Sequence, residues 1–449
     1  MNKDLLVRAH PIGSNGFYLY SRAARDWVSG VGVKVGSIHD PRGKSGMAHV
    51  VEHMLGKFPK DEELRWRMYG LRPDDGSNIR MDRSSTNYGH LMVLRRAFML
   101  DAFDICTRAV LQPERINAQA LERERPAVRN EFFLRGKDYI ESEFSEWMHQ
   151  AMYQGVNPAS EAMCCREEDL YGITVQEALQ FYRANYGAET EFAVLLGLPY
   201  PKARRMVEER FGHLKPTGRK PLVIPEVRPK LSGIKDFVIE KRGINQYHVG
   251  IGFPTGPYGS PDDLDLDVLA DIWQERCWDI IREENRDWNG GSYRVYAETP
   301  RTFAQGMIYI WFATPTLESA QRNAERVVAE AMRLRDEFAP DDLYIKAKRE
   351  LEYDHLDTLK LSVGDLCELI IEAACNGDEE MVGLNSYLER LARVGKKTIL
   401  RVANEYFTPN AYVHVLVKPD RTDVPNETIV VNGWREVKDV VQSPEPSSA

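Results

Sequence analysis

The sequence predicts an α+β protein made of two homologous halves, each with helices packed on a mainly antiparallel sheet. Two pairs of similar segments indicate the duplication, because both pairs recur in the same order and at nearly the same offset. The strand-like run VGVKVGS at 31–37 recurs as VGIGFP at 249–254. The helix–strand unit at 173–199 recurs at 394–419, after almost the same interval. Either match alone is weak, but together they favour two copies of one unit.

Two long segments, 93–111 and 316–337, carry apolar residues at helical spacing and predict one long helix in each half. Several prolines and charges between the halves predict a stiff linker at 216–234. The first half is therefore expected to span 1–215 and the second 235–425. We expect residues 426–449 to form a tail, because their final run VQSPEPSSA has little to bury.

Composition narrows the class of protein. Of 449 residues, 43% are hydrophobic and 28% charged, which is typical of globular chains. The formal net charge of −9 does not favour nucleic-acid binding, which normally needs a basic surplus. The sequence contains no run of about 18 apolar residues, so it predicts no membrane span. The N-terminus lacks the apolar core of a signal peptide. The six cysteines contain no CxxC pair, which favours free thiols. We therefore expect a cytoplasmic protein that does not insert into membranes.

The run GMAHVVEHMLG at 46–56 holds a metal-binding pattern. On a helix, His49 and His53 lie one turn apart on one face, where two imidazoles can bind one ion. Glu52 stands beside that face, where a base for a metal-bound water is needed. This H-x-x-E-H order is a known zinc-hydrolase signature. The alternative is a surface helix with two histidines and an incidental acid.

A catalytic zinc site needs a third protein ligand and one open position. The acidic segment 117–135 is the best source of that ligand. Glu124 and Glu131 are two helical turns apart and share a helical face, whereas Glu122 points the opposite way. Charges at this density also occur on solvated helix faces. The two phenylalanines after Glu131 indicate that its face is partly buried.

With these motifs the sequence resembles the M16 metallopeptidases, inverzincins of the pitrilysin and mitochondrial processing peptidase type. In that family a ligand Glu follows the second His after a characteristic long interval, and another Glu precedes the ligand by two helical turns. Here Glu131 follows His53 at that same interval, and Glu124 precedes Glu131 as the family pattern requires. The run GSIHDPRGKSGMAH also resembles the approach to the family motif. The resemblance covers nearly the whole chain and implies the short, two-unit M16B form of the M16/LuxS-like metallohydrolase fold.

The resemblance implies one Zn²⁺ per chain, bound by His49, His53 and Glu131. It makes Glu52 the general base and Glu124 an outer residue that orients a ligand. The sequence departs from the family pattern at two positions. Val50 replaces an aromatic residue or Leu, and Pro126 falls between Glu124 and Glu131, where it would kink a helix.

The second half lacks the motif, since Asp267 and Asp271 stand opposite the two histidines and Ala270 opposite Glu52. We expect no second metal site there. The family places an Arg and a Tyr in this half to hold substrate and stabilise the oxyanion. Arg282 and Tyr293 match the flanking pattern, although Arg286 keeps the usual spacing to the tyrosine.

By the same resemblance, residues 76–88 occupy the position of the family's edge strand. An extended peptide can add to such an edge through backbone hydrogen bonds. Asn78, Ile79 and Arg80 are the candidate substrate-binding residues.

The predicted function is a zinc-dependent endopeptidase that hydrolyses peptides or short unfolded polypeptides inside a dimeric clamshell chamber. A homodimer is favoured, and a heterodimer with a related M16 subunit is the second choice. The alternative function is a non-catalytic or partner subunit of a heterodimeric M16-type complex.

Overall fold

The structure, a computed structural model, describes residues 6–14, 16–24, 26–57, 78–94, 96–138, 140–153, 166–220, 222–223, 228–241, 243–283, 294–360, 363–420 and 435–436. Within those residues, no helix combines the length and the apolar character that a membrane span needs. Most of the predicted tail and parts of the predicted linker lie outside this set, and the described tail residues 435–436 form strand β13. The boundaries expected for the two halves stay predictions.

The first half builds a six-stranded sheet in the order β1-β2-β6-β3-β5-β4. Neighbours are antiparallel except for β2 and β6, which run parallel. The strands are β1 (Arg8–Ile12), β2 (Phe17–Arg22), β3 (Trp27–Val33), β4 (Asn78–Met81), β5 (Thr86–Leu94) and β6 (Glu191–Leu196).

The second half builds a seven-stranded sheet in the order β10-β11-β8-β12-β7-β13, with β9 paired to β11. Its parallel pairs are β12 with β7 and β7 with β13. The strands are β7 (Lys235–Lys241), β8 (Tyr247–Thr255), β9 (Val295–Glu298), β10 (Arg301–Thr302), β11 (Gln305–Thr314), β12 (Val413–Pro419) and β13 (Arg435–Glu436).

The two sheets share one strand topology. The order β2-β6-β3-β5 in the first sheet matches β7-β12-β8-β11 in the second, and the parallel pair occupies the same place in both. The repeated runs at 31–37 and 249–254 contribute to β3 and β8, which are equivalent strands. The predicted fold class, two homologous α+β halves with mainly antiparallel sheets, is therefore confirmed.

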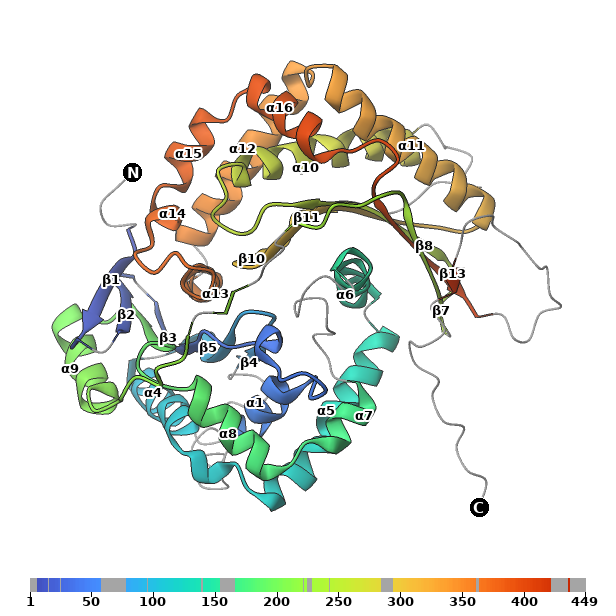
Figure 1. Cartoon of the computed structure of the whole chain (residues 1–449). Helices are drawn as coiled ribbons and strands as arrows, with labels where there is room; N and C mark the ends of the chain where they lie inside the picture. The colour runs from blue at the N-terminus through green and yellow to red at the C-terminus, as the bar shows by residue number, and fades with distance from the viewer. Residues whose placement is uncertain are drawn as a thin grey trace, which may run out of the picture.

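Helices cover both sheets (Figure 1). The first half has α1 (Met47–Gly56), α4 (Arg96–Leu111), α5 (Ala118–Asp138), α6 (Ile140–Tyr153), α7 (Glu167–Gly172), α8 (Val175–Asn185) and α9 (Tyr200–Phe211). The second has α10 (Asp263–Trp278), α11 (Leu317–Asp336), α12 (Asp341–Lys360), α13 (Val363–Cys375), α14 (Val382–Asn385), α15 (Tyr387–Arg393) and α16 (Lys396–Tyr406). Short 3₁₀ turns η2 (Ser37–His39) and η3 (Pro113–Arg115) and a π-helical turn η5 (Asp279–Glu283) complete the elements.

The two predicted long helices form, with one difference. The helix expected from residue 93 begins only at Arg96, because Leu94 still pairs with Trp27 in the sheet. The helix expected at 316–337 is α11, and its start is fixed by Thr316, whose hydroxyl accepts the backbone N–H of Ser319.

Each half contributes one helix that packs on the sheet of the other half. Helices α1, α4 and α8 pack on one face of the first sheet, while α13 of the second half covers its other face. In return, α10, α11 and α16 pack on one face of the second sheet, and α6 of the first half covers the other. Figure 1 shows α6 and α13 between the two sheets, with α1 and α10 on opposite sides of the molecule.

Glycines in β8 allow α6 to approach the second sheet. A Cβ on Gly250 would lie 2.4 Å from the Phe144 ring, and one on Gly252 would lie 2.5 Å from the terminal carbon of Met148. Real Cβ atoms do not come so close, so a side chain at either position would push α6 away from the sheet.

We expect Gly250→Ala to lower the free energy of unfolding by about 1–3 kcal/mol, the usual cost of an overpacked core. Urea unfolding followed by tryptophan fluorescence measures it. Gly233→Ala is the matched control, because a Cβ there meets no atom within 4 Å. Equal stability of the two variants would contradict the close packing of α6.

Candidate metal centre

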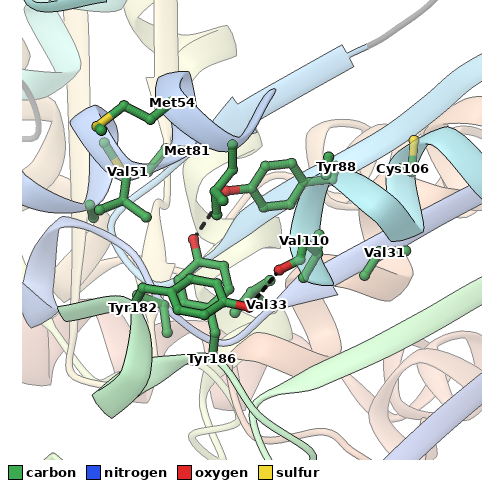
Figure 2. Close-up of a cluster of buried hydrophobic side chains, with 14 of the residues drawn as sticks. Val31, Val33, Val51, Met54, Met81, Tyr88, Cys106, Val110, Tyr182 and Tyr186 are labelled. Atoms are coloured by element: carbon green, nitrogen blue, oxygen red, sulfur yellow. Dashed lines mark hydrogen bonds between the residues drawn. The ribbon is translucent and has the colours of Figure 1, made fainter. Parts of the chain in front are cut away.

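Helix α1 is held by the core of the first half. Its apolar side chains are all buried, namely Met47, Ala48, Val50, Val51, Met54 and Leu55. Figure 2 shows Val51 and Met54 within a buried cluster that includes Val33, Tyr88 and Tyr186. This packing fixes the rotation of the helix about its axis, and so fixes where its polar residues point.

The start of α1 is stabilised by a residue from the preceding loop. Gly46 precedes the helix with φ 86°, a conformation that favours glycine, and its own position offers no capping side chain. The Asp40 carboxylate accepts the backbone N–H groups of Gly46 at 2.6 Å and Ala48 at 2.8 Å. It thus satisfies donors that a helix leaves unpaired at its first turn.

The two motif histidines converge. Their Nε2 atoms lie 3.2 Å apart, and the rings stand at 70° to each other. Both side chains are mostly buried, with 9% of His49 and 14% of His53 exposed. Two ring nitrogens at this spacing are aimed at one point, as the sequence spacing predicted.

Glu131 completes a set of three donors. Its carboxylate comes from α5, which packs against α1, and lies 3.4 Å from Nε2 of His49 and 3.6 Å from Nε2 of His53. Donors about 2.0–2.2 Å from a tetrahedral zinc ion lie about 3.3–3.6 Å from one another. The two imidazole nitrogens and the Glu131 carboxylate, whose two oxygens each face one histidine, have about this spacing. Across the described ranges, these three residues form the one group of His, Cys, Asp or Glu side chains that could share a metal.

Glu52 stands beside this set and is well buried. One of its oxygens lies 3.8 Å from Nε2 of His49 and 3.7 Å from Nε2 of His53. Burial raises the pKa values of the nearby Tyr88 and Tyr186 hydroxyls, and the negative charge of Glu52 raises them further. Those hydroxyls hydrogen-bond each other at 3.1 Å beneath α1 (Figure 2). The carboxylate is therefore close to the donor set and screened from solvent.

Glu124 faces the other nitrogen of His53, despite Pro126. The proline lies inside α5, but the helix runs unbroken from Ala118 to Asp138. One Glu124 oxygen lies 3.6 Å from Nδ1 of His53, and the other accepts Nε of Arg123 at 2.6 Å. Glu122, in contrast, is exposed and pairs with Arg125, as the helical spacing predicted.

The acidic residues make the site attractive to a cation. Burial alone would lower the pKa of His53, but Glu124, Glu131 and the charge of Glu52 raise it to about 10. Hydrogen bonds from His49 and His53 hold the pKa of Glu131 well below its ordinary value. Three carboxylates around two imidazoles leave an excess of negative charge that a divalent ion would neutralise.

The candidate substrate-binding residues lie next to this site. β4 is the last strand of its sheet, and it pairs only with β5 among the described strands. Ile79 packs against the end of α1 near Gly56, and Arg80 is exposed. Asn78 belongs to the same strand, but its side chain lies outside the described set. The edge strand is therefore adjacent to the metal helix.

The structure does not bring Arg282 to the donor set of its own chain. Arg282 lies in η5 at the end of α10, with its guanidinium 4.4 Å from the centre of the Trp278 ring. Helices α10 and α1 occupy opposite sides of the molecule (Figure 1). Tyr293 and Arg286 lie outside the described residues.

Helix α10 holds carboxylates where α1 holds histidines. Asp267 accepts hydrogen bonds from the guanidinium of Arg301 and from the Thr299 hydroxyl. Asp271 lies one turn further on, and burial, then the charge of Asp267, raises its pKa to about 7. Arg301 is almost fully buried and supplies a positive charge in this half. No sequence pattern indicated the roles of Arg301 or Asp40, because both depend on contacts across loops.

Comparisons with known proteins agree with this fold. Residues 172–351 match the model of the Peptidase M16 inactive domain. A crystal structure of a protease from Helicobacter pylori superposes with a TM-score of 0.78, at 19% identity, over 92% of this chain and 100% of that chain. The fold is that of an M16-type peptidase.

Two relatives extend the comparison. Zinc protease PqqE of Helicobacter pylori is 20% identical over 401 residues, which is 86% of each chain. The beta subunit of the mitochondrial-processing peptidase of Dictyostelium discoideum is 24% identical over 213 residues, covering 45% of this chain and 43% of that subunit. The chain is thus similar to M16 peptidases, the family that the sequence motifs indicated.

We expect Asp40→Ala to lower the free energy of unfolding by about 1–2 kcal/mol, because the first turn of α1 loses its cap. Thermal and urea unfolding of the full chain measure the loss. Glu122→Ala serves as the control, since its side chain is exposed. An Asp40→Ala protein as stable as the parent would show that the loop does not hold α1.

Proposed function

We propose that the chain is a zinc-dependent endopeptidase that cleaves peptides and short unfolded polypeptides. The observation that carries this proposal is the convergence of His49, His53 and Glu131 at the donor spacing of a tetrahedral zinc site. Glu52 stands beside those donors, where a general base is needed. A non-catalytic scaffold has no use for this combination of residues.

The donor set leaves one side open. His49 and Glu52 are buried beneath α5, whereas 37% of the Glu131 side chain is exposed. Zinc bound by three protein ligands lowers the pKa of a bound water to about 7 and polarises a carbonyl. The exposed side, near Glu131, is where water and substrate would enter.

Glu52 would act as the general base. Its oxygen lies within 4 Å of both ligand nitrogens, so this carboxylate would be near a water bound to an ion held by those residues. The carboxylate would take a proton from that water and later donate it to the leaving amine. Glu124 would hold the His53 ring through Nδ1, which leaves Nε2 free for the ion.

The edge strand β4 would hold the substrate. An extended peptide that pairs with Asn78, Ile79 and Arg80 adds a strand to the sheet, next to the end of α1. Such binding selects unfolded chains, because backbone donors and acceptors must be available. The net charge of −9 would favour basic peptides, with rates that fall as salt rises.

A dimer would complete the site. Arg282 lies on the opposite side of its own chain from α1, so its contact with substrate at the metal site requires a second chain. In a symmetric pair, each chain would offer Arg282 and Tyr293 to the partner's site, where they would stabilise the oxyanion. A homodimer is thus self-sufficient, and a heterodimer with a related subunit is the second possibility.

A second candidate function is a partner subunit without catalysis. The matching family model is of the inactive domain, and one relative is a subunit of a processing peptidase. That model covers 172–351, whereas every residue of the metal set lies between 49 and 131. Measured zinc content together with chelator-sensitive cleavage of a peptide pool distinguishes the two functions.

We expect Glu52→Gln to keep about one zinc per chain but to lose about 10³-fold or more in turnover, since only the base is removed. Glu131→Gln, with the same change of charge, should instead lose the metal. Elemental analysis and a quenched-peptide assay measure both quantities. If Glu131→Gln keeps zinc while Glu124→Gln does not, the third ligand is Glu124.

Mixing two inactive variants tests the shared site. Glu52→Gln and Arg282→Ala homodimers should each be nearly inactive, at a mass of roughly 100 kDa, twice that of one chain. After exchange of subunits, half the dimers are mixed, and each mixed dimer has one complete site. Activity should therefore recover to about a quarter of the parent value. No recovery in a mixture shown to contain mixed dimers would mean that Arg282 does not act across chains.

A further inference from the structure

Two cross-strand pairs of side chains lie on one face of the β9–β11 pair. The register places Tyr296 opposite Trp311 and Glu298 opposite Tyr309, so all four point to the same side of the sheet. Phe144 of α6 closes one flank, with its ring centre 5.7 Å from that of Trp311. Together these five residues line a cavity of about 170 Å³.

The cavity is mostly aromatic, and its rings are stacked. Trp311 lies between two parallel rings, Tyr296 at 5.7 Å and His248 at 5.8 Å, tilted by only 8° and 6°. Trp311 is 4% exposed and Tyr309 1%, whereas Tyr296 is 42% exposed and marks the mouth. Burial, with the charge of Lys241, lowers the pKa of His248 to about 4, so this stack carries no charge at neutral pH.

One carboxylate lies at the mouth of this aromatic cavity. Glu298 is exposed and accepts a hydrogen bond from the Tyr309 hydroxyl at 2.5 Å, which holds it in place. Among the described residues, no Lys or Arg forms an ion pair with it. A fixed carboxylate beside the exposed ring of Tyr296 is an arrangement that binds an organic cation.

A buried donor also lacks a partner. The indole Nε1–H of Trp311 is buried and has no acceptor among the described residues. An unpaired N–H in the interior costs free energy, so such groups normally hydrogen-bond to protein, water or a ligand. A peptide whose side chain enters the cavity carries backbone carbonyls that could accept this proton.

We propose that this cavity binds the side chain of an arginine or lysine in a peptide substrate, at a site separate from the metal centre. The cation would pair with Glu298 and lie against the exposed ring of Tyr296, while the indole N–H of Trp311 donates a hydrogen bond to a peptide carbonyl. This assignment rests on the proposed peptidase function and names its substrate class, a basic peptide. It agrees with the acidic net charge of the chain.

Binding without cleavage tests the cavity directly. The probe is a fluorescein-labelled 15-residue peptide of Ser, Ala and Leu with one central arginine, compared with the same peptide carrying citrulline. Citrulline keeps the shape of arginine but has no charge. Fluorescence anisotropy with the full-length Glu52→Gln protein should show about tenfold tighter binding of the arginine peptide, as expected for one cation held by a carboxylate and an aromatic face.

Glu298→Gln, added to the Glu52→Gln protein, should remove this preference while leaving citrulline binding unchanged. Glutamine still accepts the Tyr309 hydroxyl, so the fold is preserved. Glu325→Gln on the exposed face of α11 makes the same charge change away from the cavity and should keep the preference. The Glu298→Gln and Glu325→Gln proteins therefore separate local pairing from general charge attraction.

Equal binding of the two peptides, or the same preference in the Glu298→Gln and Glu325→Gln proteins, would overturn the proposal. Because the assay needs no turnover, a chain without peptidase activity would still show the arginine preference. Failure of the proposed peptidase function and failure of this cavity assignment are thus distinguishable.

Discussion

The contact between α1 and α5 is the constraint on which the candidate site depends. Two imidazoles on one helical turn supply two donors, but the third must come from another helix at a fixed distance. The core holds α1 in one rotation, and α5 brings Glu131 within 3.6 Å of both Nε2 atoms. Moving these helices apart by even the length of one bond would leave two histidines and no tetrahedral site.

The second half shows what the equivalent helix carries in place of the two histidines. In the second half, α10 occupies the place of α1 but carries aspartates, and the buried guanidinium of Arg301 pairs with Asp267. The second half thus pairs an aspartate of this helix with an arginine of the same chain, whereas the first half places Glu124 and Glu131 of α5 against the histidines of α1. The two halves share one strand topology but differ in the polar contacts of the equivalent helix.

Much of the fold and of the donor set could be predicted from the sequence. The offset of the repeats predicted two equivalent sheets, and the spacing of His49 and His53 predicted two donors on one helical face. The family resemblance then selected Glu131 as the third donor. Spacing could not predict the roles of Asp40 and Arg301 or the cavity lined by Trp311. Their roles depend on which loop meets which helix and on strand register, which local patterns do not specify. The packing of α6 and α13 on the sheets of the opposite halves could not be predicted either, since an apolar helix does not indicate which sheet it will cover.

That packing has a consequence for synthesis of the chain. The buried cluster on the inner face of the first sheet joins Tyr20, Val28 and Val194 to side chains between Leu359 and Leu384. A ribosome makes the sheet long before it makes α13, so this face stays uncovered until more than four-fifths of the chain has emerged. Contacts so distant in sequence form slowly and expose apolar surface while they wait. The nascent protein therefore passes through a long interval in which the inner face of the first sheet is exposed to aggregation.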